Sequence, residues 1–390
     1  MPKARQTATL AIHAGAQLQS RARPLVPAIH VASVSYFDDA ESLDRSMDGQ
    51  DFVYARINGP NASLLEEAVA SLEGAQACVA YASGMAALRA VAEAQGWKDG
   101  DAIVIPADCY GLTRTYLKGY AAQRGVQVHS LTLSSPEGLA QLAALRPRFV
   151  LAESISNPCV RVTDLRAVAG ACKERGAVFA VDATFASPAL QQPLALGADY
   201  VLHSTTKWIN GHSDALGGVV SGSRARMDVL RAARVIDGAI LGPFEAYLTL
   251  RGLRTLPLRM KAHSEHAVQV AARLAASPAV ERVYYPERSD LLPQGAGGML
   301  AFEIRGAKAA HCRAFLEAVR LARPAPSLGD VSTTVMHAAT AAARRMTPAE
   351  REVAGIRENL IRVSVGLEDP GDITDDLLAA VASAMDGARS

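Results

Sequence analysis

A lysine, Lys207, follows a short apolar strand and two small hydroxyl residues within the segment Asp199 to Asp214. In a parallel α/β sheet this position lies at the crevice where ligands bind. A lysine attacks carbonyl groups only as the free amine, so a catalytic lysine requires burial or a neighbouring cation that lowers its pKa. An isolated lysine is more often a side chain that reaches from a strand end into solvent. Its interpretation as a nucleophile therefore depends on its surroundings.

A carboxylate at the end of a second apolar strand favours the catalytic interpretation. The segment Ala177–Asp182 has the pattern of a buried strand, and we expect it to lie beside the lysine strand. An acid at this place can keep a pyridine nitrogen protonated, which makes the ring of pyridoxal phosphate (PLP) an electron sink. The hydroxyls of Ser204 and Thr206 flank the lysine and are suited to a phosphate. Lys207 and Asp182 therefore predict a PLP site.

Three ordered segments, Val181–Pro188, Leu196–Asp199 and His203–Asp214, resemble the Cys/Met-metabolism family of PLP enzymes. This family includes cystathionine γ-synthase, cystathionine γ-lyase, methionine γ-lyase and O-acetylhomoserine sulfhydrylase. Further matching segments extend the resemblance to nearly the whole chain. The resemblance implies PLP fold type I, which is similar to aspartate aminotransferase: an α/β protein with a large, doubly wound, mostly parallel sheet domain and a smaller α+β C-terminal domain.

The same resemblance implies roles for residues on other segments. Tyr110 would stack on the cofactor ring and assist proton transfer at the leaving group. Arg362, Ser327 and Asn157 would bind the α-carboxylate of the substrate. Catalysis would fall to Lys207, Tyr110 and Asp182. The implied cofactor-binding residues are Tyr54, Arg56, Ser83, Gly84, Met85, Tyr110, Asn157, Asp182, Thr184, Ser204, Thr206 and Lys207.

Alternating strand and helix patterns must position these residues. Apolar runs predict strands at Ala77–Tyr81, Ala102–Pro106, Arg148–Glu153 and Ala177–Asp182, and a helix capped by Asp164 precedes the last of them. This alternation predicts a doubly wound parallel sheet. The turn Ala82–Met85 opens a helix, where free backbone N–H groups form an anion site. The segment Ser63–Glu66 has the pattern of a capping box.

Three regions are expected along the chain. Residues 1–55 have no sustained period and form an arm that contacts a partner subunit, with Tyr54 and Arg56 reaching the neighbour's cofactor phosphate by resemblance. Residues 56–240 form the PLP-binding domain. Residues 241–390 form the C-terminal α+β domain, with strands expected at 280–285, 299–304 and 360–365 and helices at about 309–320 and 374–386. An alanine-rich segment near residue 340 has helical propensity.

Composition excludes several classes of function. The 390 residues include 40 basic and 39 acidic side chains, well mixed, for a net charge of +1, which favours neither nucleic acid nor membrane binding. The five cysteines are scattered without a C-x-x-C spacing, and the nine histidines show no metal pattern. Reduced thiols, the polar start of the chain and the lack of a long apolar run predict a cytoplasmic protein without a metal site.

The favoured function is a PLP-dependent carbon–sulfur lyase of the transsulfuration type. It would perform γ-elimination on a sulfur amino acid, methionine or cystathionine, and release a 2-oxo acid, ammonia and a thiol. We expect a homo-oligomer, a dimer of dimers in which each active site is shared across a dimer.

Two alternatives use the same fold. A γ-replacement transferase (O-acetyl- or O-succinylhomoserine sulfhydrylase, or cystathionine γ-synthase) would share every catalytic residue with the lyase. A cystathionine β-lyase is the other alternative. Sequence separates these only through Leu112, Thr115, Pro326 and Asp330, none of them decisive. The segment His337–Ala343 also lacks residues that relatives have. A binding or scaffold protein that has lost catalysis is a third possibility, which the complete set of catalytic residues argues against.

Overall fold

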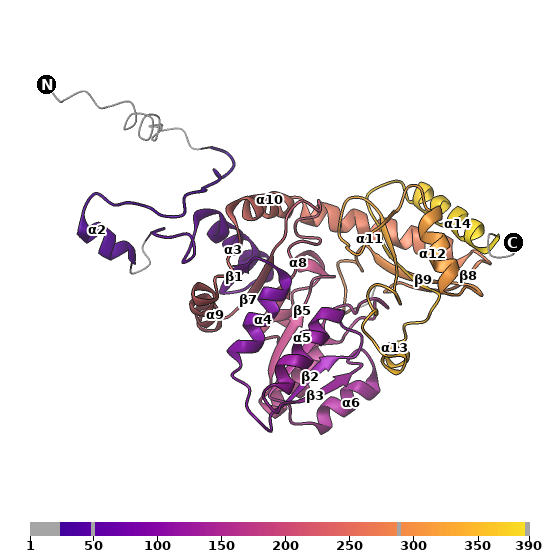
Figure 1. The fold of residues 1–390 in the computed structure, drawn as a ribbon, viewed down its shortest axis with the longest axis horizontal. Coiled ribbons are helices and arrows are strands. Elements are labelled where there is room, and N and C mark those ends of the chain that lie inside the picture. Colours follow the sequence, from indigo (N-terminus) through magenta and orange to yellow (C-terminus); the bar gives the residue numbers. More distant parts are fainter. Residues whose placement is uncertain (1–23, 48–50, 287–289, 387–390) are drawn as a thin grey trace.

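A seven-stranded sheet forms the centre of the larger part of the molecule (Figure 1). The computed structural model describes residues 24–47, 51–286 and 290–386. Strand β7 is antiparallel to both of its neighbours, and the remaining pairs are parallel, which confirms a mostly parallel sheet. The strand order is β1 (Ala77–Tyr81), β7 (Gly218–Gly222), β6 (Tyr200–His203), β5 (Val178–Asp182), β4 (Phe149–Glu153), β2 (Ala102–Pro106) and β3 (Gln127–Leu131).

Helices cover both faces of this sheet because its strands are apolar on both sides. In β4, Phe149 and Leu151 pack with α4, α5 and α9, whereas Val150 and Ala152 pack with α6 and α7 on the opposite face. This alternation follows from the two-residue period of a strand. The helices of this part are α3 (Pro60–Glu73), α4 (Gly84–Ala94), α5 (Gly111–Ala122), α6 (Pro136–Ala144), α7 (Leu165–Arg175), α8 (Ser187–Leu190) and α9 (Arg224–Asp237).

Local sequence signals specify most of these boundaries, with one exception. Strands β1 and β2 have the predicted limits, and Asp164 caps α7 by accepting a hydrogen bond from Ala167 N at 3.0 Å. The capping box predicted at Ser63 is wrong. Helix α3 begins three residues earlier, with Pro60 in its first turn, because proline favours that position. Glu66 is therefore within the helix and free to bond elsewhere.

The described part of the N-terminal arm, residues 24–47 and 51–55, extends away from the sheet (Figure 1). It contains α2 (Ala40–Arg45), which has no buried residue, and a single β-bridge between Val34 and Tyr54. The side chain of Asn61 holds the arm by bonding to Ala28 O and His30 N, both at 2.8 Å. Residues 1–23 of the predicted arm lie outside the described residues. Contact with a partner subunit stays a prediction.

The C-terminal part is a smaller α+β unit, as expected. Its five-stranded sheet has the order β10 (Arg323–Pro324), β11 (Thr334–His337), β12 (Leu360–Ser364), β9 (Met299–Ile304) and β8 (Val280–Tyr284). Its helices are α12 (Ala309–Ala318), α13 (Pro348–Ala354) and α14 (Pro370–Asp386). The alanine-rich segment forms turns instead of a helix, with Ala343 N bonded to Ala338 O. Among the described residues, no helix is long and apolar enough to cross a membrane.

Two helices join the parts, α10 (Pro243–Leu253) and α11 (Leu256–Ala275). Leu253, Leu256 and Met260 belong to the same apolar cluster as Leu65 of α3, so the start of α11 packs against the larger part. Further along α11, Val270 and other residues pack with the smaller sheet. The helix therefore spans both cores, and the domain limit near residue 240 stays a prediction.

Candidate active site

A pocket of about 240 Å³ opens where the strands of the large sheet end. Glu153, Asp182 and His203 are the last residues of β4, β5 and β6, and all three line it. Crevices at the carboxyl ends of parallel strands are the usual ligand sites of such sheets. The lining residues also include Ser83, Gly84, Met85, Leu88, Tyr110, Thr113, Ile155, Asn157, Thr184, Phe185, Leu202, Ser204, Thr206, Lys207, Leu216, Pro326, Leu328 and Arg362.

Lys207 lies in this pocket four residues after β6. Its Nζ donates a hydrogen bond to the Oγ of Ser327 in the C-terminal part at 2.9 Å. Burial, together with the positive charge of Arg362, lowers the pKa of Lys207 to about 8. About a tenth of the amine is therefore unprotonated at pH 7, and this free amine is the form that a nucleophile or base requires.

Asp182 is held by its neighbour Thr184. The backbone N–H and the hydroxyl of Thr184 both donate to Oδ1 of Asp182, at 3.0 and 2.5 Å. Burial raises the pKa of Asp182, while the bonds from Thr184 and the nearby His203 oppose this rise. A carboxylate fixed in this way is suited to pair with a protonated ring nitrogen.

The turn between β1 and α4, where an anion site is predicted, has a geometry suited to one. Ser83 caps α4 by accepting a hydrogen bond from Ala86 N at 3.1 Å. A Cβ added at Gly84 would lie 2.9 Å from the Cβ of Ser204, so only glycine allows this approach. Ser204 N donates to the hydroxyl of Thr184 at 2.9 Å. Helix N–H groups and hydroxyls that converge in this way fit a phosphate.

The hydroxyl of Thr206 has a different principal partner. Gly217 N donates to Thr206 Oγ1 at 3.0 Å, and this oxygen lies 3.3 Å from Gly217 O. These bonds hold the residue directly before the lysine against the start of β7. A direct phosphate contact by Thr206 stays a prediction.

Arg362 reaches the pocket from the C-terminal part of the chain. It lies in β12 and is 4% exposed, and its η nitrogens donate to Asn157 Oδ1 at 3.1 Å and Ser327 O at 2.8 Å. Its Nε has no hydrogen-bond partner among the described residues. Burial lowers the pKa of Arg362 to about 10, which leaves it charged at neutral pH. A buried cation with a free donor fits a carboxylate.

Tyr110 is hydrogen-bonded to Glu153. The sequence predicted a role for Tyr110 but none for Glu153. Tyr110 is 43% exposed and lies at the start of α5, where its backbone N–H donates to Glu153 Oε1 at 2.8 Å. Glu153 Oε2 has no partner among the described residues. Burial and the charge of Asp182 raise the pKa of Glu153 well above its usual value. The position of Glu153 at the end of a predicted strand was the feature of the sequence that could have indicated a place in the site.

A buried pair behind the pocket was also missed. His203 Nε2 lies 2.6 Å from Glu73 Oε1, and both side chains are inaccessible to solvent apart from 1% of His203. This pair ties the end of β6 to the last turn of α3. Glu73 and His203 are 130 residues apart, so only the structure identifies them as partners.

Tyr54 and Arg56 do not line this pocket within the described chain. Arg56 donates to Val235 O at 2.6 Å, and its Cζ lies 5.3 Å from the centre of the Tyr54 ring. The two side chains therefore lie together on one surface loop. Their predicted contact with a neighbour's cofactor stays a prediction.

The segment His337–Ala343, which lacks residues that relatives have, lies near α5. A Cβ at Gly111 would be 2.9 Å from Ala342 O, so the turns after His337 pack closely on the residue that follows Tyr110. Pro326 lines the pocket. No group of three or more potential metal ligands occurs among the described residues.

The fold and site together define a class. A strand-end carboxylate, a lysine of lowered pKa, an anion-binding turn and an arginine from a second domain match a PLP enzyme of fold type I. The turn at Gly84, which lies close to Ser204, fits the phosphate of the cofactor. The Nε donor of Arg362, which has no partner among the described residues, fits the carboxylate of an amino-acid substrate.

Comparisons with known proteins give the family. Residues 8–382 match the family described as Cys/Met metabolism PLP-dependent enzyme. The chain is 37% identical to the L-methionine gamma-lyase of Pseudomonas putida over 97% of this chain and 96% of that one. It is 39% identical to the O-succinylhomoserine sulfhydrylase of Pseudomonas aeruginosa, with 85% and 84% covered.

A solved structure agrees with these relatives. The crystal structure of cystathionine gamma synthase from Xanthomonas oryzae pv. oryzae in complex with cystathionine has a TM-score of 0.86, 37% identity and coverage of 98% of this chain and 99% of that one. The chain belongs to the Cys/Met metabolism family of PLP-dependent enzymes. The lyase, sulfhydrylase and synthase are similar to it to nearly the same degree, so the comparisons define the family and not one reaction.

Proposed function

We propose that this enzyme is a carbon–sulfur lyase that performs γ-elimination on a sulfur amino acid of the methionine or cystathionine type. After hydrolysis by one water molecule, the products are a 2-oxo acid, ammonia and a thiol. One observation carries the proposal: the amine of Lys207, with a pKa of about 8, lies in one pocket with the buried guanidinium of Arg362. A base and a carboxylate anchor in one pocket are suited to taking a proton from the α-carbon of an amino acid.

The residues divide the reaction between them. Arg362, with Asn157 and Ser327 around it, binds the substrate carboxylate and orients the Cα–H bond. Bound PLP supplies an electron sink for the pair that this bond releases. Lys207 takes the Cα proton as the free amine. A second proton shift at Cβ then permits loss of the γ-substituent.

Two other side chains complete the site. Asp182 keeps the ring nitrogen protonated, and its fixed orientation by Thr184 supports this role. Tyr110 lies over the pocket and donates a proton to the leaving sulfur as the Cγ–S bond breaks.

We propose further that the site is completed by a second copy of the chain. In a dimer, Tyr54 and Arg56 of one subunit bind the cofactor phosphate of the other, beside Ser83, Gly84 and Met85. Their position on an exposed loop outside their own pocket supports this arrangement. Pairing of two dimers gives the expected tetramer, which size measurement in solution tests.

γ-Replacement is the second candidate. The O-succinylhomoserine sulfhydrylase relative, 39% identical, supports it because a sulfhydrylase introduces a sulfhydryl group. Both reactions require the same residues up to loss of the γ-substituent. They differ in whether a thiol then adds at Cγ.

The mass of the keto acid tests the proposal. PLP-loaded enzyme is given L-cystathionine or L-methionine, with Lys207→Ala as the control. Release of 2-oxobutanoate from either supports γ-elimination, whereas pyruvate from cystathionine indicates a β-lyase. If neither keto acid forms, the lyase proposal is wrong for these substrates, and thiol addition to an activated homoserine is tested next.

A further inference from the structure

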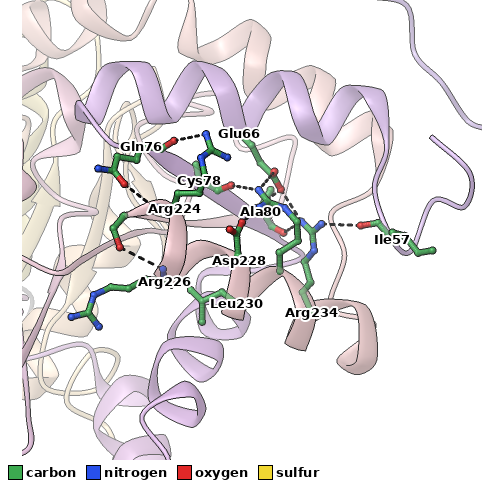
Figure 2. A network of polar contacts seen from close by, with 12 residues as sticks. Ile57, Glu66, Gln76, Cys78, Ala80, Arg224, Arg226, Asp228, Leu230 and Arg234 are labelled. Atoms are coloured by element: carbon green, nitrogen blue, oxygen red, sulfur yellow. Dashed lines mark hydrogen bonds and ion pairs between the residues drawn. The ribbon is translucent and has the colours of Figure 1, made fainter. Parts of the chain in front are cut away.

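The loop that carries Tyr54 and Arg56 is held by the last turns of α9. The backbone oxygen of Ile57 accepts a hydrogen bond from Arg234 Nη2 at 3.3 Å, and Figure 2 shows this bond at the edge of a larger polar network. The next residue of α9, Val235, accepts the bond from Arg56 described above. Two consecutive residues of one helix therefore contact the loop.

Arg234 is itself rigidly held. It is 4% exposed, and its Nη1 lies 2.7 Å from Glu66 Oε1 and donates to Ala80 O at 2.9 Å. Glu66 Oε1 also accepts from Ala80 N at 2.9 Å, so the carboxylate bridges the arginine and β1, an edge strand of the large sheet (Figure 2). A buried ion pair satisfied by further hydrogen bonds keeps one geometry and costs stability when one partner is removed.

We propose that Arg234 is a positioning residue, which anchors the Tyr54–Arg56 loop to β1 so that Arg56 meets the phosphate bound by the partner subunit. This inference rests on the proposed dimeric site. A guanidinium has five N–H donors, so the bond from Arg56 to Val235 leaves donors for the phosphate. The stacking of Arg56 over Tyr54 limits its orientations.

The planar fork of arginine is needed for this task. Arg234 reaches a carboxylate on α3, an oxygen on β1 and an oxygen in the loop, which lie on three separate segments. A lysine at this place keeps the charge opposite Glu66 but cannot satisfy three acceptors in fixed directions. Arg234→Lys therefore tests the positioning of the loop while it keeps the positive charge next to Glu66.

Arg231 provides a matched control. It lies on the same helix and forms an ion pair with the same carboxylate, at 3.1 Å from Glu66 Oε2. Its other bonds go to Cys78 O at 2.9 Å and Asp228 at 3.3 Å, and not to the loop. Arg231→Gln disturbs the ion pair without releasing Ile57.

The experiment compares the affinity of the apo-enzyme for PLP with its affinity for pyridoxal, which lacks the phosphate. Arg56→Gln, Arg234→Gln and Arg234→Lys are each expected to weaken PLP binding by about tenfold, the size of one lost charge-assisted bond. Pyridoxal binding stays unchanged, and Arg231→Gln keeps the wild-type ratio. The double variant Arg56→Gln/Arg234→Gln is expected to be no weaker than Arg56→Gln, because both act through one contact.

Each other result contradicts the inference. Equal loss of PLP and pyridoxal binding in Arg234→Lys would show a merely structural role. Additive losses in the double variant would show that Arg234 acts independently of Arg56. If Arg56→Gln weakens PLP binding and the Arg234 variants do not, the inference alone fails. If Arg56→Gln binds PLP normally, the dimeric phosphate site fails and the inference with it.

Mixed dimers test whether the effect crosses between subunits. A dimer of one Lys207→Ala chain and one Arg234→Gln chain contains one site with an intact lysine that faces an intact loop. This site is expected to bind PLP with wild-type affinity. Weak binding there would place the effect within the subunit that carries the Arg234 substitution, which overturns the proposed action on the partner.

Discussion

Replacement of Arg362 tests how the carboxylate of the substrate is bound. This side chain is 4% exposed, and its bonds to Asn157 and Ser327 hold the guanidinium with Nε directed to no protein partner among the described residues. Truncation of one partner in a buried charge pair typically costs about 3–5 kcal/mol. We therefore expect Arg362→Met to lower kcat/KM by about 10² to 10⁴. Arg362→Lys keeps the charge but loses the fork, and we expect a smaller loss.

The assay separates substrate binding from cofactor binding. Titration with L-methionine or L-cystathionine is followed through the absorbance of the lysine-bound cofactor, which reports binding whether or not turnover follows. Cofactor content is expected to match the wild type in both Arg362 variants. Arg323→Met, on the exposed strand β10 of the same sheet, is the control and should bind substrate normally. If Arg362→Met binds these amino acids as tightly as the wild type, Arg362 does not bind the carboxylate.

Three further predictions concern ionisable groups of the pocket. Because the pKa of Lys207 is about 8, reaction of the apo-enzyme with PLP should accelerate as pH rises towards 8 and level off above it; a rate independent of pH in that range contradicts this. Asp182→Asn should keep PLP but lower kcat by at least about 10², whereas Asp228→Asn, which disturbs an exposed pair with Arg231, should not; equal activities would contradict the role of Asp182. Glu153 has a raised pKa in the folded state, so the folded protein binds more protons than the unfolded one and this group lowers stability as pH rises above about 4.5. Glu153→Gln should therefore be at least as stable as the wild type at pH 8 in thermal unfolding, and Glu153→Ala less stable by about 1–3 kcal/mol because Tyr110 N–H loses its acceptor; equal losses in both would contradict the raised pKa of Glu153.

The local pattern of the chain was sufficient to predict the central elements and several site residues. A run of apolar residues with a polar residue at its end specifies a buried strand and the place where it leaves the sheet. Asp182 therefore had a predictable position, as did the lysine that follows β6. The helix cap at Asp164 is equally local. The capping box at Ser63 failed because a nearby proline offered a competing start for the same helix.

The packing of distant segments decided the remaining features. Lys207 and Ser327 are 120 residues apart, and Arg362 and Asn157 are 205 apart, so no local pattern relates them without the resemblance to a family. The pair of Glu66 and Arg234, separated by 168 residues, had no signal in the sequence. Burial, which sets the pKa of Lys207 and Glu153, depends on the neighbours that the fold supplies from other elements. Sequence thus specified which residues stand at strand ends, and the assembled fold determined their partners and charge states, because contact and desolvation arise only when distant segments meet.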